Sequence, residues 1–433
     1  MKMSDEKILV FSSREICYLS GNFFAHQIGA AFEELGYEVE ICEVSEGDDL
    51  DAVLEPLTGR PYRLILDFNS MLPGLAMEDG QPYPDRLSGP FFNYVLDHPL
   101  FHYNSLTSAA ENLHAIVPDE AQEAYVRAYY PQVKRVFTLP LAGTRSFTAQ
   151  GREEASEREL CGERAESTPA EADKCLMNRQ ADRQCRVFFP GTYDDPESVY
   201  RLVQEAPAPQ RDAMKALTGM RLADPLLPME EAFARYLQER DIRLTRGQFA
   251  LSMNAMYPVD AYVRDYFRKA AVDALLSAGL PVTVMGEGWQ KYHFPDERLL
   301  RRERGCSFAL SFERIAREEI LLNVSPIFSH GMHDRIPAGM ANGTVVLTDE
   351  NPYLARRFAD GETIAFYSLK DIDTLAGKAA LLMEDSGLRE RIKRQAYREF
   401  CAHDTWKHRA EQILKMSDGM EGRDGTELSE KTG

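Results

Sequence analysis

The sequence of 433 residues lacks the features of several protein classes. Its seven cysteines include no C-x-x-C pair, and Cys161, Cys175 and Cys185 are too widely spaced for a zinc site, so we expect reduced thiols. Its 50 basic residues are outnumbered by 69 acidic ones, and a net charge of −19 repels nucleic acid and anionic membrane surfaces. A disulfide scaffold, a zinc protein and a nucleic-acid-binding protein are therefore disfavoured.

The sequence also lacks long apolar runs and several catalytic and nucleotide-binding motifs. The polar start of the chain has no basic region, apolar stretch or cleavage site, so we expect no signal peptide. The most apolar later stretch, residues 308–328, is interrupted by charged side chains, so we expect no transmembrane segment and a cytoplasmic location. Neither G-x-S-x-G nor G-x-x-x-x-G-K-[ST] occurs, and Ser20-Gly21-Asn22 is not G-x-G-x-x-G. A hydrolase of that type, a P-loop kinase and a dinucleotide-dependent oxidoreductase all lose support.

Short apolar runs alternate with helical segments in the first half of the chain. A strand over Ile8–Phe11, a helix over Phe23–Leu35 and a strand around Val39 and Ile41 form a β-α-β unit. Further expected elements are strands at Leu64–Leu66, Phe91–Leu96, Ala115–Val117 and Val136–Phe137, and a helix over Glu120–Tyr129. This alternation predicts a parallel sheet covered by helices on both faces.

The same alternation begins again at Val187-Phe188-Phe189, after a polar stretch. Expected here are helices over Met229–Glu239 and Asp260–Ala278, and strands over Val282–Met285, Phe308–Leu310, Ile320–Asn323 and Thr344–Leu347. We predict a first domain at 1–145, a polar linker or insertion at 146–185, a second domain at 186–415 and a disordered polar tail at 416–433. A ligand site is expected in the crevice between the two domains, at the carboxyl ends of the strands.

Two glycines follow the strand expected over Val282–Met285. The turn Gly286-Glu287-Gly288-Trp289 would let the backbone approach a ligand closely, because glycine has no side chain. The alternative is that the glycines serve only the geometry of the turn and that Trp289 is a core aromatic.

A polar loop follows the strand expected over Ile320–Asn323 and carries His333-Asp334-Arg335 into a helix expected over Ile336–Asn342. The free N–H groups of a helix start and the guanidinium of Arg335 together suit a diphosphate. The alternative is that Asp334 caps the helix and Arg335 pairs with an acidic neighbour. His330 and His333 have no H-E-x-x-H motif or cysteine partner, so we predict no metal site.

A carboxylate and two imidazoles follow the strand expected over Phe91–Leu96 in the first half. Asp97, His98 and His102 are candidates to orient an acceptor hydroxyl or to accept its proton. The alternative is that Asp97 and His98 shape the turn before Pro99. We favour function, because this strand end should face the crevice.

Taken together, these residues resemble the GT-B glycosyltransferases, and within them the spore-maturation-protein (CgeB-like) glycosyltransferase family. The resemblance covers residues 187–415 at the level of motifs and the rest of the chain at the level of the fold. The segments that carry it are His333-Asp334-Arg335, Ala341-Asn342-Gly343, Leu347-Thr348-Asp349, and His403-Asp404-Thr405-Trp406 with His408-Arg409-Ala410.

The resemblance implies an α/β, GT-B-like fold of two Rossmann-like parallel-sheet domains facing a central cleft. It implies metal-independent transfer of a hexose-type sugar from a nucleoside-diphosphate-sugar to a hydroxyl-bearing carbohydrate, protein or small molecule, with retention of the anomeric configuration and without a cofactor. The catalytic candidates are Asp97, His98 and His102 in the first domain. The candidates for donor binding are Gly286, Gly288, Trp289, Asn323, Ser325, His333, Asp334, Arg335, Asn342, Gly343, Thr348 and Asp349.

Two departures from the wider group bear on activity. The glutamate that binds the donor ribose in many retaining GT-B enzymes corresponds here to Ala338, and no Arg/Lys pair follows Gly191-Thr192-Tyr193, where related enzymes often hold the diphosphate. Arg335 is then the leading phosphate ligand. A catalytically silent GT-B-like protein that binds a nucleotide or a partner is the main alternative, and an epimerase or a phosphorylase is a further one.

Overall fold

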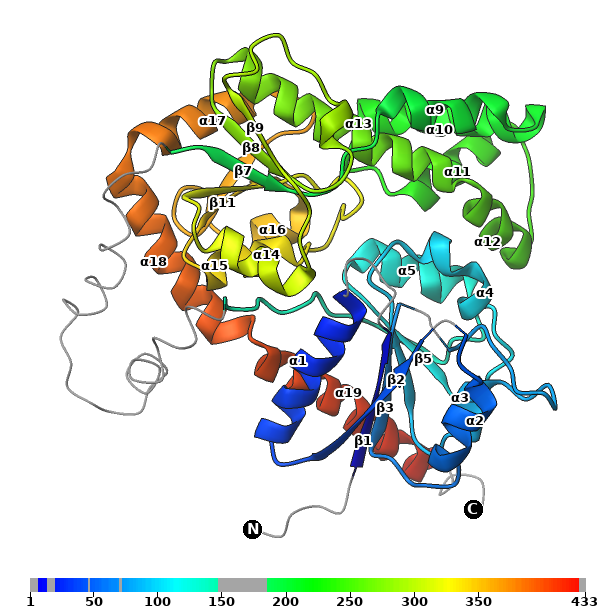
Figure 1. Ribbon diagram of the computed structural model, residues 1–433. Helices are drawn as coiled ribbons and strands as arrows, with labels where there is room; N and C mark the ends of the chain where they lie inside the picture. The colour runs from blue at the N-terminus through cyan, green and yellow to red at the C-terminus, as the bar shows by residue number, and fades with distance from the viewer. Residues whose placement is uncertain (1–6, 14–19, 46, 70–71, 147–184, 428–433) are drawn as a thin grey trace, which may run out of the picture.

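The computed structural model describes residues 7–13, 20–45, 47–69, 72–146 and 185–427. They form two α/β domains, which lie one above the other in Figure 1, and each is built on a six-stranded sheet. All ten strand pairings that join these strands into the two sheets are parallel. The predicted fold of two parallel-sheet domains is confirmed.

The first domain has the strand order β2-β1-β3-β4-β5-β6. Its strands are β1 (Lys7–Ser13), β2 (Glu38–Val44), β3 (Leu64–Phe68), β4 (Phe91–Tyr94), β5 (Leu113–Val117) and β6 (Arg135–Thr138). Its helices are α1 (Ser20–Glu34), α2 (Leu50–Leu54), η2 (Glu55–Leu57), α3 (Tyr83–Arg86), η3 (Pro99–His102), α4 (Tyr103–Leu106) and α5 (Glu120–Tyr129). The central strands β3, β4 and β5 are buried along their whole length, which is why they are mainly apolar, with Asp67, Asn93 and His114 as their polar residues.

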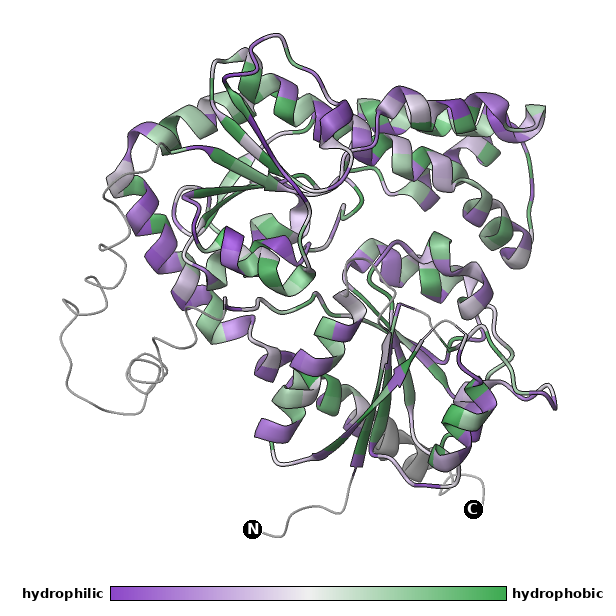
Figure 2. Ribbon diagram, viewed as in Figure 1, coloured by the Kyte–Doolittle hydropathy of each residue, from purple (hydrophilic) through white to green (hydrophobic). Residues whose placement is uncertain are grey.

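The second domain has the strand order β12-β11-β10-β7-β8-β9. Its strands are β7 (Val187–Pro190), β8 (Val282–Met285), β9 (Leu300–Glu303), β10 (Ile320–Asn323), β11 (Val345–Asp349) and β12 (Ala365–Tyr367). The helices of this half are α9 (Pro196–Glu205), α10 (Ala208–Ala223), α11 (Met229–Glu239), α12 (Arg246–Ala255), α13 (Tyr257–Ser277), η4 (Trp289–Lys291), α14 (Phe308–Ile315), α15 (Arg335–Ala341), α16 (Pro352–Arg357), α17 (Asp373–Glu384), α18 (Ser386–His403) and α19 (Trp406–Glu427). In Figure 2 the strands of both sheets are mostly hydrophobic, and the helices around them carry polar residues on their outer sides.

The strand predicted over Phe308–Leu310 is wrong, because these residues open helix α14. A run of three apolar residues fits either structure, and the helical spacing shows only when Phe312 and Ile315, which are the buried residues of α14, are included. Strand β9 was not predicted, because its sequence Leu-Arg-Arg-Glu is polar, as suits the edge of a sheet.

Helices α9 to α12 are inserted between β7 and α13 and project to one side of the second domain in Figure 1. Helix α12 reaches the first domain, where the ring of Phe249 stacks on Tyr129 of α5 at a centroid distance of 3.9 Å. Asn254 Nδ2 donates to the carbonyl oxygen of Leu100 in η3 at 2.8 Å. The insertion therefore contacts the first domain at a place apart from the segments where the chain passes from one domain to the other.

The C-terminal helix α19 returns to the first domain and packs against α1, as Figure 1 shows. At the crossing, Trp406 Nε1 donates to Thr144 Oγ1 at 2.8 Å, and buried Arg409 donates to the carbonyl oxygen of Pro140 and to the carboxylate of Asp404, both at 2.5 Å. Helix α19 continues to Glu427, through residues that were expected to form a disordered tail. Residues 147–184 of the predicted linker and residues 428–433 lie outside the described residues.

Among the described residues, no helix combines the length and the apolar character that crossing a membrane requires.

Candidate active site

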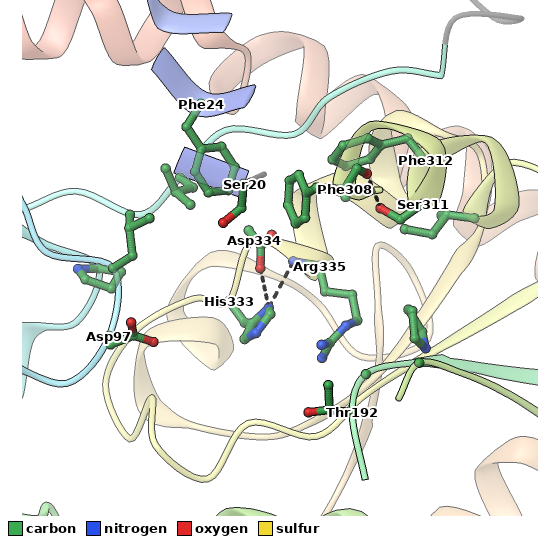
Figure 3. Close-up of a pocket in the computed structure, with 18 of the residues that line it drawn as sticks. Ser20, Phe24, Asp97, Thr192, Phe308, Ser311, Phe312, His333, Asp334 and Arg335 are labelled. Atoms are coloured by element: carbon green, nitrogen blue, oxygen red, sulfur yellow. Dashed lines mark hydrogen bonds and ion pairs between the residues drawn. The ribbon is translucent and has the colours of Figure 1, made fainter. Parts of the chain in front are cut away.

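A cavity of about 360 Å³ lies between the two domains, at the carboxyl ends of strands from both sheets. The first domain contributes Ser20, Phe24, Asn69, Leu96, Asp97, Pro118 and Leu141 to its lining. The second domain contributes, among others, Gly191, Thr192, Arg264, Arg268, Gly286, Phe308, Phe312, His333, Asp334, Arg335 and Ala338. Figure 3 shows side chains of both domains pointing into this one space. The position is the one expected for a ligand in an open parallel α/β sheet.

Three arginines line the cavity from the second domain. Arg335 begins α15, and Arg264 and Arg268 lie one turn apart on α13, near the loop that follows β7. Arg335 Nη1 donates to Asn323 Oδ1 at 2.7 Å, and Arg268 Nη1 donates to the carbonyl oxygen of Thr192 at 3.4 Å. Arg268 Nε is buried and has no hydrogen-bond partner among the described residues. These groups supply several N–H donors to one end of the cavity.

Burial and the other two arginines of the cluster disfavour the charged form of Arg268. Burial, together with the charges of Arg264 and Arg335, lowers the pKa of Arg268 to about 9. Burial also lowers the pKa of Arg335. The ion-pair partner of the α13 arginines is Asp265, whose carboxylate lies 3.2 Å from Arg264 Nε and 3.8 Å from Arg268 Nη1. An anion with several oxygens would offset this repulsion.

Arg264 and Arg268 were not predicted as site residues from the sequence. Their helix was predicted over Asp260–Ala278, and their spacing of four residues places both on one face. The signal was therefore present, but the direction in which that face points depends on how α13 packs on the sheet.

His333 and Asp334 form a close pair inside the cavity. His333 Nδ1 lies 2.6 Å from Asp334 Oδ1 and 3.1 Å from the backbone nitrogen of Arg335. Burial lowers the pKa of His333. Burial alone would raise the pKa of Asp334, but the neighbouring His333 and Arg335 hold it below its ordinary value. Asp334 makes no side-chain cap to α15, so the predicted alternative of a helix cap does not describe it.

Four of the predicted donor ligands lie behind Arg335 and outside the lining of the cavity. Asn323 Oδ1 accepts from Arg335 and, at 3.0 Å, from Ser325 Oγ, while Asn323 Nδ2 donates to Thr348 Oγ1 at 2.9 Å. Asp349 Oδ1 accepts from the backbone nitrogen of Ser325 at 2.9 Å, and burial raises the pKa of Asp349 to about 6. These residues hold the guanidinium of Arg335 in place.

The glycine turn after β8 shapes the loop beside the arginines. Gly286 and Gly288 have φ values of 146° and 85°, and a Cβ atom at either position would collide with the backbone of the loop after β7. Trp289 is buried, and its Nε1 donates to the carbonyl oxygen of Gly191 at 2.6 Å. Gly286 lines the cavity, whereas Gly288, which lies against Tyr193, and Trp289, which holds Gly191, do not.

Asn342 and Gly343 lie at the opposite end of α15 from Arg335. Asn342 Nδ2 donates to the carbonyl oxygen of Thr144 at 2.8 Å, and Asn342 Oδ1 accepts from the backbone nitrogen of Ser146 at 2.8 Å. Gly343 has a φ of 64°, as expected for the residue that ends a helix. Asn342 fixes the segment that connects the domains, and neither residue lines the cavity.

Only Asp97 of the three catalytic candidates lines the cavity. Its Oδ2 accepts from Asn69 Nδ2 at 2.8 Å, and Asn69 takes the left-handed conformation, with a φ of 58°, to make this contact. His98 Nδ1 accepts from the backbone nitrogen of Leu100 and caps η3, as the alternative of a turn before Pro99 implies. His102 is half-buried outside the cavity, and burial lowers its pKa to about 4.

The loop that carries His333 is held by the first domain. Asp119 is fully buried, and its Oδ2 accepts from the backbone nitrogen of His330 at 2.7 Å, while its Oδ1 caps α5. Glu120 donates its backbone N–H to the carbonyl oxygen of His330 at 3.1 Å. A Cβ atom at Gly331 would collide with the backbone of Pro118 and Asp119. The sequence contained no signal for this cross-domain contact.

Comparison with known proteins supports the fold and part of the function. Residues 264–415 match the family model described as "Glycosyl transferase-like". No curated protein matches the sequence. Sucrose-phosphate synthase from Thermosynechococcus elongatus is similar in structure, with 12% identity, a TM-score of 0.50, and coverage of 96% of this chain and 100% of that chain.

Two further solved structures are similar at lower scores. A glycosyltransferase from Rickettsia africae has 8% identity and a TM-score of 0.47, and covers 96% of this chain and 98% of its own. Anabaena HepE, solved in complex with UDP and glucose, has 10% identity and a TM-score of 0.46, and covers 96% of this chain and 100% of its own. The chain thus has the GT-B fold of glycosyltransferases, and its residues 264–415 match a glycosyl transferase-like family model.

Proposed function

We propose that the protein transfers a hexose-type sugar from a nucleoside-diphosphate-sugar to a hydroxyl-bearing acceptor in the cavity between the domains. The observation that carries this proposal is the cluster of Arg264, Arg268 and Arg335 in the lining of one cavity, where Arg268 Nε is buried without a hydrogen-bond partner among the described residues. A diphosphate carries enough oxygens to accept from several guanidinium N–H groups at once.

The same arginines give the transfer step its electrostatic support. Negative charge develops on the diphosphate as the bond to the sugar breaks, and donors already aimed at that charge each contribute about 3 kcal/mol. Arg335 is preorganised for this role, because Asn323 fixes its guanidinium before any ligand arrives. The proposal includes metal independence, and unchanged transfer in the presence of EDTA is the expected result.

Asp97 and His333 are the groups that we propose for the acceptor hydroxyl and the sugar. Asp97 reaches the cavity from the first domain and is held by Asn69. His333 Nδ1 is engaged by Asp334 and by the backbone N–H of Arg335, which leaves Nε2 to form a hydrogen bond with a hydroxyl group of the sugar. Retention of the anomeric configuration rests on the resemblance to the CgeB-like family, and an NMR spectrum of the product would test it.

The diphosphate assignment is tested by isothermal titration with UDP and GDP. We expect Arg335→Ala and Arg268→Ala each to weaken binding by roughly 10- to 100-fold, as for the loss of a hydrogen bond to a charged group. Arg298→Ala is the matched control, because this arginine is 89% exposed and pairs only with Asp296 on the surface. Wild-type affinity in both cavity variants would remove the assignment.

The catalytically silent alternative is separated by turnover. The release of nucleoside diphosphate is measured with a panel of nucleotide sugars, with and without hydroxyl-bearing acceptors. If the protein binds nucleotide sugars but releases no nucleoside diphosphate from them, the catalytically silent alternative is supported. The observation that favours this alternative is Ala338 in place of a glutamate.

A further inference from the structure

Helices α9 to α12 are not needed to connect the strands of the second sheet. Strands β7 and β8 are parallel neighbours, and one crossover helix between them is enough for such a pair. Helix α13, which precedes β8, supplies that crossover. The role of the four inserted helices therefore lies in their other contacts, and α12 packs on η3, α4 and α5 of the first domain (Figure 1).

The turn that leads from β4 into η3 carries Asp97 to the cavity and His98 to the insertion. Asp97 lines the cavity, whereas the side chain of His98 is only 4% exposed and does not line it. His98 Nδ1 accepts from the backbone nitrogen of Leu100 at 3.0 Å, which leaves the ring proton on Nε2. This Nε2 lies 3.4 Å from Oε2 of Glu230 in α11, to which it donates. The imidazole thus joins the turn to the insertion.

A second contact holds the same turn from α12. Asn254 Nδ2 donates to the carbonyl oxygen of Leu100 at 2.8 Å, so both backbone polar groups of Leu100 are bound, one by His98 and one by the insertion. Leu100 itself is fully buried. Beside this contact, the ring of Phe249 lies within 9° of parallel to that of Tyr129. Helices α11 and α12 therefore hold the turn through two separate hydrogen bonds.

On its other side the turn is held within the first domain. Asn69 Oδ1 accepts from the backbone nitrogen of Leu96 at 3.1 Å, and Asn69 Nδ2 donates to Asp97 Oδ2 at 2.8 Å. Because His98 follows Asp97 directly in the chain, a displacement of His98 also displaces the backbone of Asp97. The position of Asp97 in the cavity thus depends on Asn69 before the turn and on the insertion after it.

We infer that the insertion positions Asp97 in the cavity, with Glu230 and Asn254 as the positioning residues. Neither of these side chains lines the cavity, so both act through the turn. The inference rests on the proposed function, in which Asp97 binds the acceptor hydroxyl group. It gives α11 and α12 a role on the acceptor side, since the arginines proposed for the diphosphate lie on α13 and α15.

Hydrogen exchange measures this coupling without any need for turnover. The backbone amides of Leu96 and Leu100 lie on either side of Asp97, and each donates to a side chain, that of Asn69 or that of His98. Their exchange rates are read at single residues by fragmentation mass spectrometry of the full chain. Faster exchange at both amides reports that the turn carrying Asp97 has loosened.

Two variants remove the contacts one at a time. We expect Glu230→Ala and Asn254→Ala each to accelerate exchange at both amides by roughly three- to tenfold, as for the loss of one hydrogen bond. Glu231→Ala is the matched control, because Glu231 is the next residue of α11, is 50% exposed and pairs with Arg235 on the surface. This control should leave both exchange rates unchanged.

Kinetics separate positioning from a general loss of structure. Turnover is followed as the release of UDP from UDP-glucose and of GDP from GDP-mannose. We expect Glu230→Ala to lower kcat roughly tenfold and to leave the dissociation constants for UDP and GDP within twofold of wild type, because the arginines keep their supports. Glu230→Gln should restore kcat, since its amide oxygen still accepts from His98 Nε2.

The outcomes separate the inference from the proposed function. Unchanged exchange at both amides in Glu230→Ala and Asn254→Ala would overturn the inference, whether or not the protein transfers sugar. Faster exchange together with a wild-type kcat would overturn it as well, because Asp97 would then act without the insertion. If neither UDP nor GDP binds to the wild type, the proposed function fails, and exchange at the two amides still decides whether the insertion holds the turn of Asp97.

Discussion

Asp119→Asn is a sharp test of how the first domain supports the donor site. In the native protein, Oδ1 accepts from the backbone nitrogens of Ala121 and Gln122 at the start of α5, and Oδ2 accepts from His330 in the other domain. Asparagine keeps one oxygen, which can still cap α5 as well as aspartate does. Its NH2 group then faces the N–H of His330, so the substitution breaks mainly the contact between the domains.

The expected magnitude follows from that single contact. A hydrogen bond to a charged group contributes about 1.5–3 kcal/mol, and a buried N–H that loses its partner is destabilising by a similar amount. Burial raises the pKa of Asp119, so removing its charge recovers part of this loss. We therefore expect a decrease of about 1–3 kcal/mol in the free energy of unfolding. Because His330 lies five residues before Arg335, we also expect a roughly three- to tenfold weaker affinity for nucleoside diphosphate.

The assay combines urea denaturation with isothermal titration of UDP and GDP. Asp385→Asn is the matched control, since Asp385 caps α18 from an exposed position and accepts only from Leu388, at 2.8 Å. This control should change stability by a few tenths of a kcal/mol and leave nucleotide affinity unchanged. Wild-type stability and affinity in Asp119→Asn would refute the reasoning, because the cross-domain contact would then carry no free energy.

Three further predictions concern the supports of the site and the candidate histidine. Trp289→Phe removes the hydrogen bond to Gly191 and should lower the free energy of unfolding by about 1–3 kcal/mol, with weaker nucleotide binding in titration. Gly288→Ala adds a Cβ at a φ of 85°, against the carbonyl of Tyr193, and should lose about 2 kcal/mol or more in urea denaturation; unchanged stability would contradict the turn geometry. The pKa of His102 is lowered from 6.5 to about 4 in the folded protein, so His102 binds a proton at higher pH in the unfolded chain than in the folded one. His102 therefore lowers the free energy of unfolding as the pH falls from 6.5 to about 4. His102→Gln should remove up to about 3 kcal/mol of that acid sensitivity, measured as the difference from wild type in pH-dependent denaturation, and equal pH profiles would show that His102 is not the cause.

The strands were predictable because parallel sheets bury both faces of their central strands. Val282–Met285 and Ile320–Asn323 coincide with β8 and β10, since each is a mainly apolar run followed by polar or glycine residues. Phe308–Leu310 failed for the opposite reason, because three apolar residues do not distinguish a strand from the first turn of a helix.

The candidate site was predictable where a residue follows directly on a strand or begins a helix next to one. Asp97 and Arg335 reach the cavity for this reason, since their elements set the direction of their side chains. Arg264 and Arg268 could not be placed, because the rotation of α13 about its axis depends on packing against distant parts of the chain. Asn323 and Thr348 were located near the site, but whether they face the cavity or hold Arg335 is decided by hydrogen bonds between neighbouring strands.

A crystal structure of the protein with bound UDP or GDP tests the central claim most directly. The account predicts that the diphosphate lies in the cavity between the domains, with its oxygens within hydrogen-bonding distance of the guanidinium groups of Arg268 and Arg335. A diphosphate bound elsewhere, or bound in the cavity without contact to either arginine, would contradict it.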